Sequence, residues 1–218
     1  MIVTLGGIKG GVGKSLISVN LAVLRSLDKK KILLVDGDDQ GTTSDWVEHR
    51  FGLGIETPWT TIRLKGASVR NEILKMKQDY DDVIIDCGGR DTVSLRAALT
   101  ITDLFLIPFQ PKSFDIWTIS QVSHLTEEAR VINPNLIASS FINCGEARGN
   151  DNEEAKEILK EINGIHPLNI SVGHRKAFSN ATAKGLGVVE LKPQDKKACS
   201  EIKTLYRYVF EGKKTSKR

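Results

Sequence analysis

The chain carries Gly7-Ile8-Lys9-Gly10-Gly11-Val12-Gly13-Lys14-Ser15 directly after a short apolar run, Ile2–Leu5, and directly before a segment with helix-spaced apolar residues. Glycines at 10, 11 and 13 allow backbone N–H groups to turn toward phosphate oxygens, and a helix that begins near Lys14 adds the positive end of its dipole. Lys14 supplies positive charge for phosphates, and the Ser15 hydroxyl is suited to bind Mg²⁺. The stretch therefore predicts a phosphate-binding loop between a strand and a helix.

Acidic residues follow two further apolar runs. Asp36 and Asp38 come after Lys31–Val35, and Asp86 comes directly after Asp82–Ile85. Open α/β sheets bind their ligands at the carboxyl ends of parallel strands, so we expect these carboxylates near the phosphate loop. An aspartate-capped turn is the simpler alternative for the first segment, and a carboxylate that ends a strand by accident is the alternative for the second.

Strand-like and helix-like segments alternate along the chain, which predicts an α/β fold: a single domain with a doubly wound, mostly parallel sheet flanked by helices. The apolar runs are nearly continuous, as expected of strands covered on both faces. With 218 residues, 40% of them hydrophobic, the chain is long enough for one such domain and short for two. The expected strands are Ile2–Leu5, Lys31–Val35, Asp82–Ile85, Asp103–Ile107 and Leu136–Ile142.

Two helices are expected in the C-terminal part of the chain. Helices are predicted over Asn152–Asn163 and Asp195–Phe210, and Gly164 and Pro167 indicate a loop after the first of them. We expect the folded domain to span residues 1–211 and residues 212–218 to form a flexible basic tail.

Composition argues against several classes of protein. The longest apolar runs are far shorter than the roughly 20 residues of a membrane-spanning helix, and Met1 leads straight into a strand instead of a secretory signal. We therefore expect a cytoplasmic protein with no membrane partner. Cys87, Cys144 and Cys199 form no CxxC pair, which argues against a disulfide framework or a zinc site. The net charge of +4 does not by itself indicate nucleic-acid binding.

The plain phosphate-loop pattern requires glycine where Ile8 stands, but residues 9–15, KGGVGKS, resemble the deviant Walker A signature shared by ParA, MinD and the nitrogenase iron protein. The resemblance to ParA covers essentially the whole chain and implies a P-loop ATPase that uses ATP and Mg²⁺. It also implies a homodimer in which Lys9 reaches the phosphates bound by the other subunit and acts as an arginine finger would. Lys14, at the phosphates of its own subunit, is expected to be catalytic as well. The residues expected to contact the nucleotide are Lys9, Gly10, Gly11, Val12, Gly13, Lys14, Ser15 and Leu16.

The same resemblance assigns roles to the first acidic segment. Residues 36–41, DGDDQG, resemble the D-x-D-P-Q-G switch segment of the family, with Asp39 in place of the proline. By position, Asp38 would orient or activate the attacking water. The residues expected at the metal are Ser15, Asp36 and Asp86, the last of them through water.

Two further positions are interpreted from the resemblance. Gly88-Gly89 stands where many relatives carry Pro-Pro, and these glycines would let a switch loop approach the γ-phosphate. Asn143 occupies the position of an asparagine that contacts adenine in relatives.

Basic residues are concentrated in the C-terminal third, the region that carries non-specific DNA contacts in ParA proteins. A solvated helix face is the alternative. The resemblance further implies a nucleoid-associated partition protein of the short ParA form, without an N-terminal helix-turn-helix, whose slow hydrolysis is stimulated by a centromere-binding, ParB-like partner. The residues expected to bind DNA are Arg175, Lys176, Lys184, Lys196, Lys197, Lys203 and Arg207.

Two other functions stay open. MinD-like positioning on a membrane would require an amphipathic C-terminal helix, but the chain ends in charged residues without bulky apolar ones. A metabolic ATP-dependent enzyme is compatible with the same loop, because one fold serves many chemistries, but the sequence indicates no substrate pocket. The sequence therefore favours DNA partition.

Overall fold

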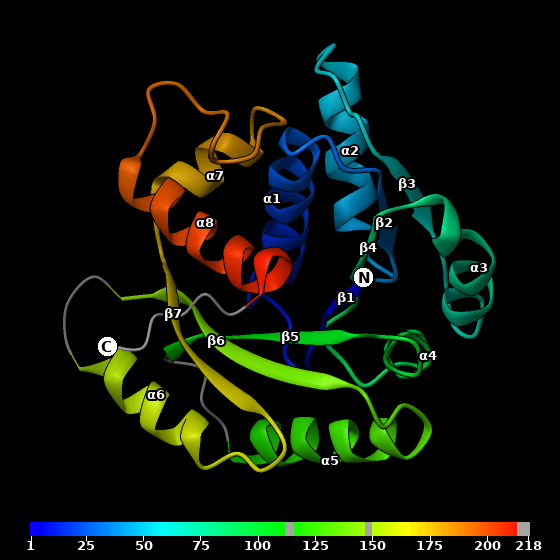
Figure 1. Ribbon diagram of the computed structural model, residues 1–218. Helices are drawn as coiled ribbons and strands as arrows, with labels where there is room; N and C mark the ends of the chain where they lie inside the picture. The colour runs from blue at the N-terminus through cyan, green and yellow to red at the C-terminus, as the bar shows by residue number, and fades with distance from the viewer. Residues whose placement is uncertain (112–115, 147–149, 213–218) are drawn as a thin grey trace.

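The computed structural model of the chain describes residues 1–111, 116–146 and 150–212. Within these residues the sheet has seven strands in the order β3-β2-β4-β1-β5-β6-β7, and all neighbouring strands are parallel. The doubly wound α/β fold expected from the sequence is thereby confirmed (Figure 1). The strands are β1 (Ile2–Leu5), β2 (Ile32–Asp36), β3 (Thr60–Arg63), β4 (Asp82–Asp86), β5 (Leu104–Phe109), β6 (Ile137–Gly145) and β7 (His166–Gly173).

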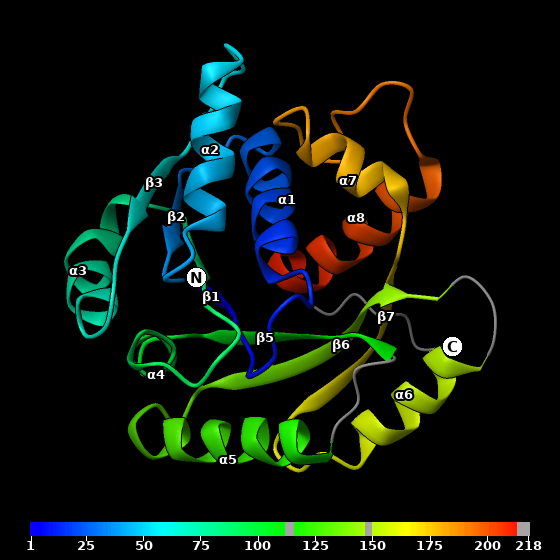
Figure 2. The same cartoon turned by 180° about the vertical axis from the view of Figure 1, so that it is seen from behind.

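Helices cover both faces of the sheet, as the two opposite views in Figures 1 and 2 show. One hydrophobic core lies between the sheet and α1, α2, α7 and α8, and a second lies between the sheet and α3, α4, α5 and α6. Central strands supply both cores: in β1, Val3 and Leu5 face the first and Ile2 faces the second. The helices are α1 (Lys14–Leu27), α2 (Thr42–Gly52), α3 (Ser68–Met76), α4 (Val93–Leu99), α5 (Ile116–Ile132), α6 (Asp151–Lys160), α7 (Lys176–Thr182) and α8 (Lys196–Glu211).

All five strands expected from apolar runs are present: Ile2–Leu5 has the expected ends, and the other four differ by one to three residues at one or both ends. β3 and β7 were not expected, because neither is a continuous apolar run. β3 is a half-exposed edge strand, and β7 alternates apolar and polar residues and contains Pro167, which on sequence indicated a loop.

The predicted C-terminal helices correspond to α6 and α8. The Asp195 side chain caps α8 by accepting hydrogen bonds from the backbone N–H groups of Lys197 and Ala198. The domain boundary expected after residue 211 stays a prediction, because residues 213–218 of the expected tail lie outside the described residues. Among the helices that the structure describes, none has the length and apolarity needed to cross a bilayer.

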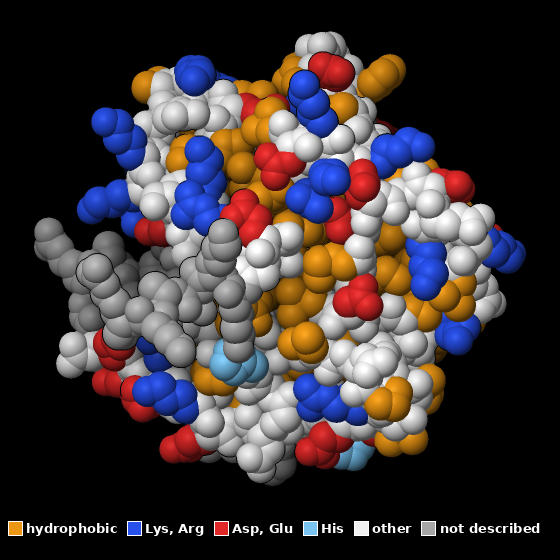
Figure 3. Space-filling model, in the orientation of Figure 1, with side chains coloured by type: hydrophobic (Ala, Val, Ile, Leu, Met, Phe, Trp, Pro, Cys, Tyr) orange, Lys and Arg blue, Asp and Glu red, His pale blue; other side chains and the backbone are white. Residues whose placement is uncertain are grey.

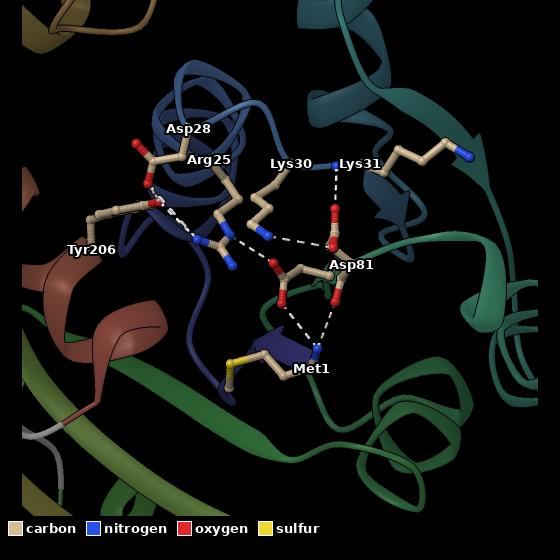
Figure 4. A network of polar contacts seen from close by, with 8 residues as sticks. Met1, Arg25, Asp28, Lys30, Lys31, Asp81 and Tyr206 are labelled. Carbon is tan, nitrogen blue, oxygen red and sulfur yellow. Dashed lines mark hydrogen bonds and ion pairs between the residues drawn. The ribbon is translucent and has the colours of Figure 1, made fainter.

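A polar network ties three elements together at the amino ends of the strands (Figure 4). Asp82 at the start of β4 is 4% exposed, and its carboxylate accepts hydrogen bonds from Arg25 Nε at 2.6 Å and from the Met1 amine at 3.0 Å. Arg25 also donates to the Tyr206 hydroxyl of α8, which donates to Asp28. A buried carboxylate needs such partners, so the network fixes α1 and α8 against the sheet.

Arg50 makes a second connection, between the end of α2 and the segment that joins α7 to α8. Its side chain is 4% exposed and forms two hydrogen bonds to Glu190, at 2.7 and 2.8 Å. It also donates to the Gly185 carbonyl at 2.9 Å and lies over the rings of Trp46 and Trp59. The C-terminal third is therefore attached to the helix that follows the first acidic segment.

We predict that Arg50→Met lowers the free energy of unfolding by about 3–5 kcal/mol, because Glu190 would keep a half-buried charge without its partner. Urea denaturation at neutral pH measures the change. Arg70→Met removes an exposed arginine from α3 and should stay within about 0.5 kcal/mol of the parent. A destabilisation no larger than that of the control would contradict the structural role of Arg50.

Candidate nucleotide-binding site

The phosphate loop follows β1 and leads directly into α1. Gly11 and Gly13 have φ angles of 75° and 86°, which residues with a side chain rarely adopt. Gly13 is the N-cap of α1 and has no side chain, so the first N–H groups of the helix point into the loop with no capping group over them. This arrangement suits a bound phosphate.

Asn143 and Gln110 support the loop from behind. The Asn143 side-chain nitrogen donates to the Val12 carbonyl at 2.7 Å, and Gln110 donates to the Gly11 carbonyl at 2.9 Å. Asn143 is buried and packs so closely under Gly13 that a Cβ there would lie 2.3 Å from its nitrogen. Asn143 thus has a contact that the sequence did not predict, and its contact with adenine stays a prediction.

Lys14 is 6% exposed, and its Nζ donates to the Lys9 carbonyl at 2.9 Å. Burial lowers the pKa of the Lys14 ammonium, and the negative charges of Asp86 and Asp38 oppose that shift. The lysine therefore lies in the field of both acidic segments, as expected from the sequence.

Asp36 and Asp86 end neighbouring strands, in register with one another, and neither is exposed. The Asp36 carboxylate accepts backbone hydrogen bonds from Asp38 at 3.1 Å and from Ser44 at 2.8 Å. Asp36 thus anchors the loop after β2 and the start of α2. Its role as a metal ligand stays a prediction.

Asp86 has the chemistry of a cation ligand. One carboxylate oxygen accepts a hydrogen bond from Thr43 at 2.7 Å, and the second oxygen, Oδ1, is buried with no partner among the described residues. Burial raises the pKa of Asp86 to about 6, and the hydrogen bonds only partly oppose this. Mg²⁺ prefers oxygen ligands and retains water, so the Ser15 hydroxyl and the unpaired carboxylate oxygen fit this ion.

A third loop, after β4, packs directly on the other two. A Cβ on Gly89 would lie 2.5 Å from the Gly10 backbone, and a Cβ on Gly88 would lie 3.0 Å from the Asp38 carboxylate. Side chains at 88 and 89 would force these loops apart. The two glycines therefore permit the close approach of this loop to the other two, and its approach to a γ-phosphate stays a prediction.

The three loops enclose a cleft of about 720 Å³, a size that suits a nucleotide. Most residues of the segments 10–16, 37–42 and 88–92 line it, among them Lys14, Ser15, Leu16 and Asp38. The structure adds Arg90 to this lining. The expected residues that lie outside the lining, in or behind the loops, are Lys9, Val12, Asp36, Asp86 and Asn143.

Most of the expected DNA-binding residues are exposed on or beside α7 and α8. Figure 3 shows Lys and Arg side chains gathered over that part of the surface. Arg175 differs, because it forms hydrogen bonds to both carboxylate oxygens of Glu201, at 2.9 and 2.5 Å. The exposed residues are Lys176, Lys184, Lys196, Lys197, Lys203 and Arg207.

We predict that Asp86→Asn stabilises the metal-free protein at pH 7. The pKa of this carboxyl rises from 3.8 to about 6 on folding, so the free energy of unfolding of the parent falls as the pH rises through that window. The full decrease is about 3 kcal/mol. Urea unfolding in chelator should show the advantage of the variant over the parent growing between pH 4 and pH 7. A difference independent of pH would contradict the burial of an unpaired carboxylate.

Several known proteins are similar to this chain. The "Maintenance of carboxysome distribution protein A" of Halothiobacillus neapolitanus is 28% identical over 205 residues, which are 93% of each chain. The "Chromosome partitioning protein ParA" of Myxococcus xanthus is 24% identical over 208 residues, 75% of this chain and 70% of that protein. Among solved structures, cobyrinic acid a,c-diamide synthase from Mycobacterium smegmatis, with an ATP analogue and magnesium bound, matches 99% of this chain and 96% of its own with a TM-score of 0.79 and 16% identity.

A family model described as the CobQ/CobB/MinD/ParA nucleotide binding domain (CbiA) matches residues 3–188. The match extends from β1 past β7 and includes the three loops of the cleft. The resemblance drawn from the phosphate loop is confirmed, and the chain belongs to the CobQ/CobB/MinD/ParA family of nucleotide-binding domains.

Proposed function

We propose that this protein is an ATP- and Mg²⁺-dependent DNA partition ATPase that acts as a nucleotide-controlled homodimer. The observation that carries the proposal is that Lys14 and Asp38 line one cleft of nucleotide size and that the buried Asp86 acts electrostatically on Lys14. The similarity to a chromosome partitioning protein supports the choice of function.

Different residues at the cleft have different roles in hydrolysis. The loop N–H groups and Lys14 bind the phosphates, and Ser15 and Asp86 would hold Mg²⁺, which would balance the negative charge of the phosphates. Asp38 accepts a hydrogen bond from the attacking water and orients it. In the dimer, Lys9 of each subunit contacts the phosphates bound by the other subunit.

Non-specific DNA binding is assigned to α7, α8 and the segment between them. Lys196, Lys203 and Arg207 lie seven and then four residues apart on α8, so they share one exposed face of the helix. Dimerisation would present two such faces to one DNA duplex and raise the affinity through effective concentration. ATP would then control DNA binding, and a centromere-binding partner would stimulate the hydrolysis that reverses it.

A second candidate is positioning of a protein compartment, which the similarity to the carboxysome distribution protein favours. The same ATP-dependent dimer would serve this function, with an adaptor on the cargo replacing the centromere-binding protein. Stimulation of ATP hydrolysis by a partner that binds DNA sites, or by one that binds a protein assembly, distinguishes the two.

We predict that Asp38→Ala binds ATP as the parent does but hydrolyses it at least about 100-fold more slowly, because the attacking water loses its orienting group. Fluorescent-nucleotide titration and single-turnover hydrolysis measure the two effects. Lys14→Ala is the control and should lose nucleotide binding itself. Parent-like turnover by Asp38→Ala would refute the assigned role.

We predict that the Asp38→Ala protein binds DNA in ATP but not in ADP, with an affinity that falls as salt rises. Combining it with Lys196→Ala, Lys203→Ala and Arg207→Ala should reduce the slope of log affinity against log salt by about 0.9 for each DNA phosphate that the variant no longer neutralises.

Fluorescence anisotropy with a duplex of arbitrary sequence measures this slope. The matched control combines Arg70→Ala, Lys75→Ala and Lys77→Ala, which remove exposed cations from the opposite helical layer. Equal changes of the salt slope in the two triple variants would refute the assigned DNA surface. Equal DNA affinity in ATP and in ADP would refute the control of DNA binding by ATP.

A further inference from the structure

The loop between β2 and α2, residues 37–41, is held from the side by the edge strand β3. Arg63, the last residue of β3, donates from Nη2 to the Asp39 carbonyl at 2.7 Å. Lys65, two residues further on, lies 3.0 Å from the Asp39 carboxylate. Asp39 therefore has a partner for its backbone at the end of β3 and a partner for its side chain in the segment that follows β3.

The Arg63 guanidinium also packs flat against Gly41. A Cβ on Gly41 would lie 2.8 Å from the central carbon and both terminal nitrogens of that group, and Gly41 has a φ of 71°. The φ of Gly41 favours glycine at this position, and the absence of a side chain there gives the guanidinium room to lie against the loop backbone.

Within the loop, hydrogen bonds hold Asp38 in a turn. Its N–H donates to Asp36, its carboxylate accepts from the Gln40 N–H at 3.1 Å, and its carbonyl accepts from the Gly41 N–H at 3.2 Å. The Asp39 carbonyl, at the middle of this turn, is bound by Arg63 from outside. A proline at 39 would restrict φ covalently, whereas aspartate leaves it free, so an external contact has more to contribute.

We propose that Arg63 is a positioning residue for ATP hydrolysis: it holds the loop of residues 37–41 so that Asp38 faces the cleft. The proposal rests on the proposed function, in which Asp38 orients the attacking water. Arg63 acts through the loop backbone and has no place in the cleft lining, so it should affect the rate and not nucleotide binding.

Arg63 and Lys65 should differ in effect, although both contact Asp39. The Lys65–Asp39 pair joins side chains that are 59% and 73% exposed, and such pairs contribute little. The Arg63 contact is exposed as well, but it joins a charged donor to a backbone carbonyl, so only one flexible side chain has to be ordered, and the guanidinium also packs against Gly41.

The test compares Arg63→Ala with Lys65→Ala, which removes the same charge beside the same residue. In the nucleotide-free protein, hydrogen exchange of a peptide covering residues 37–41 should be about fivefold faster in Arg63→Ala, the effect of removing one hydrogen bond, and unchanged in Lys65→Ala. In the ATPase assay, Arg63→Ala should lower kcat about tenfold with KM for ATP within twofold of the parent, whereas Lys65→Ala should match the parent.

Unchanged exchange of the loop in Arg63→Ala would overturn the proposal, and so would faster exchange with a parent-like kcat. A decrease of kcat with an equal decrease of ATP affinity, or the same decrease of kcat in Lys65→Ala, would also overturn it. If the parent itself hydrolyses no ATP, the proposed function fails, and the exchange measurement still decides whether Arg63 holds the loop.

Discussion

Two carboxylates with no solvent exposure end neighbouring strands of the sheet, and the site is built around that pair. Asp36 and Asp86 are in register at the carboxyl ends of β2 and β4. Burying two negative charges together is unfavourable unless N–H groups, hydroxyls or cations surround them. Backbone N–H groups surround Asp36, whereas Asp86 retains an unpaired oxygen and an ammonium group nearby. The fold thus carries an unbalanced negative charge where its loops converge, and this charge favours a cation there.

Much of the site could be predicted from the sequence, because its main residues follow strands directly. Lys14, Asp38 and Asp86 each lie within a recognisable motif at the carboxyl end of a strand, and parallel strands bring such ends together. Thr43 and Arg63 could not be predicted, because their contacts depend on how α2 and β3 pack. Arg63 in particular belongs to an edge strand whose half-exposed residues give no strong strand signal.

The C-terminal third was the least predictable from sequence. β7 carries a proline and alternates in polarity, so its residues indicated a loop, and the ion pair that joins Arg175 to Glu201 spans two elements that no motif connects. A count of basic residues treats Arg175 like its neighbours, whereas the structure shows its charge neutralised. Charge patterns in sequence predict where cations are, but packing decides which of them remain available to a ligand.

The helix α2 begins in the loop that holds Asp38 and ends near Arg50, whose partners Gly185 and Glu190 belong to the segment that leads to α8. Arg50 lies about 12 Å along the axis from the first turn of the helix. A rigid helix that pivots by about 5° at its first turn therefore displaces Arg50 by about 1 Å, and buried hydrogen bonds transmit such a displacement instead of absorbing it. The length of α2 would thus turn a tilt of a few degrees beside the loop of residues 37–41 into a displacement of about 1 Å at the segment between α7 and α8.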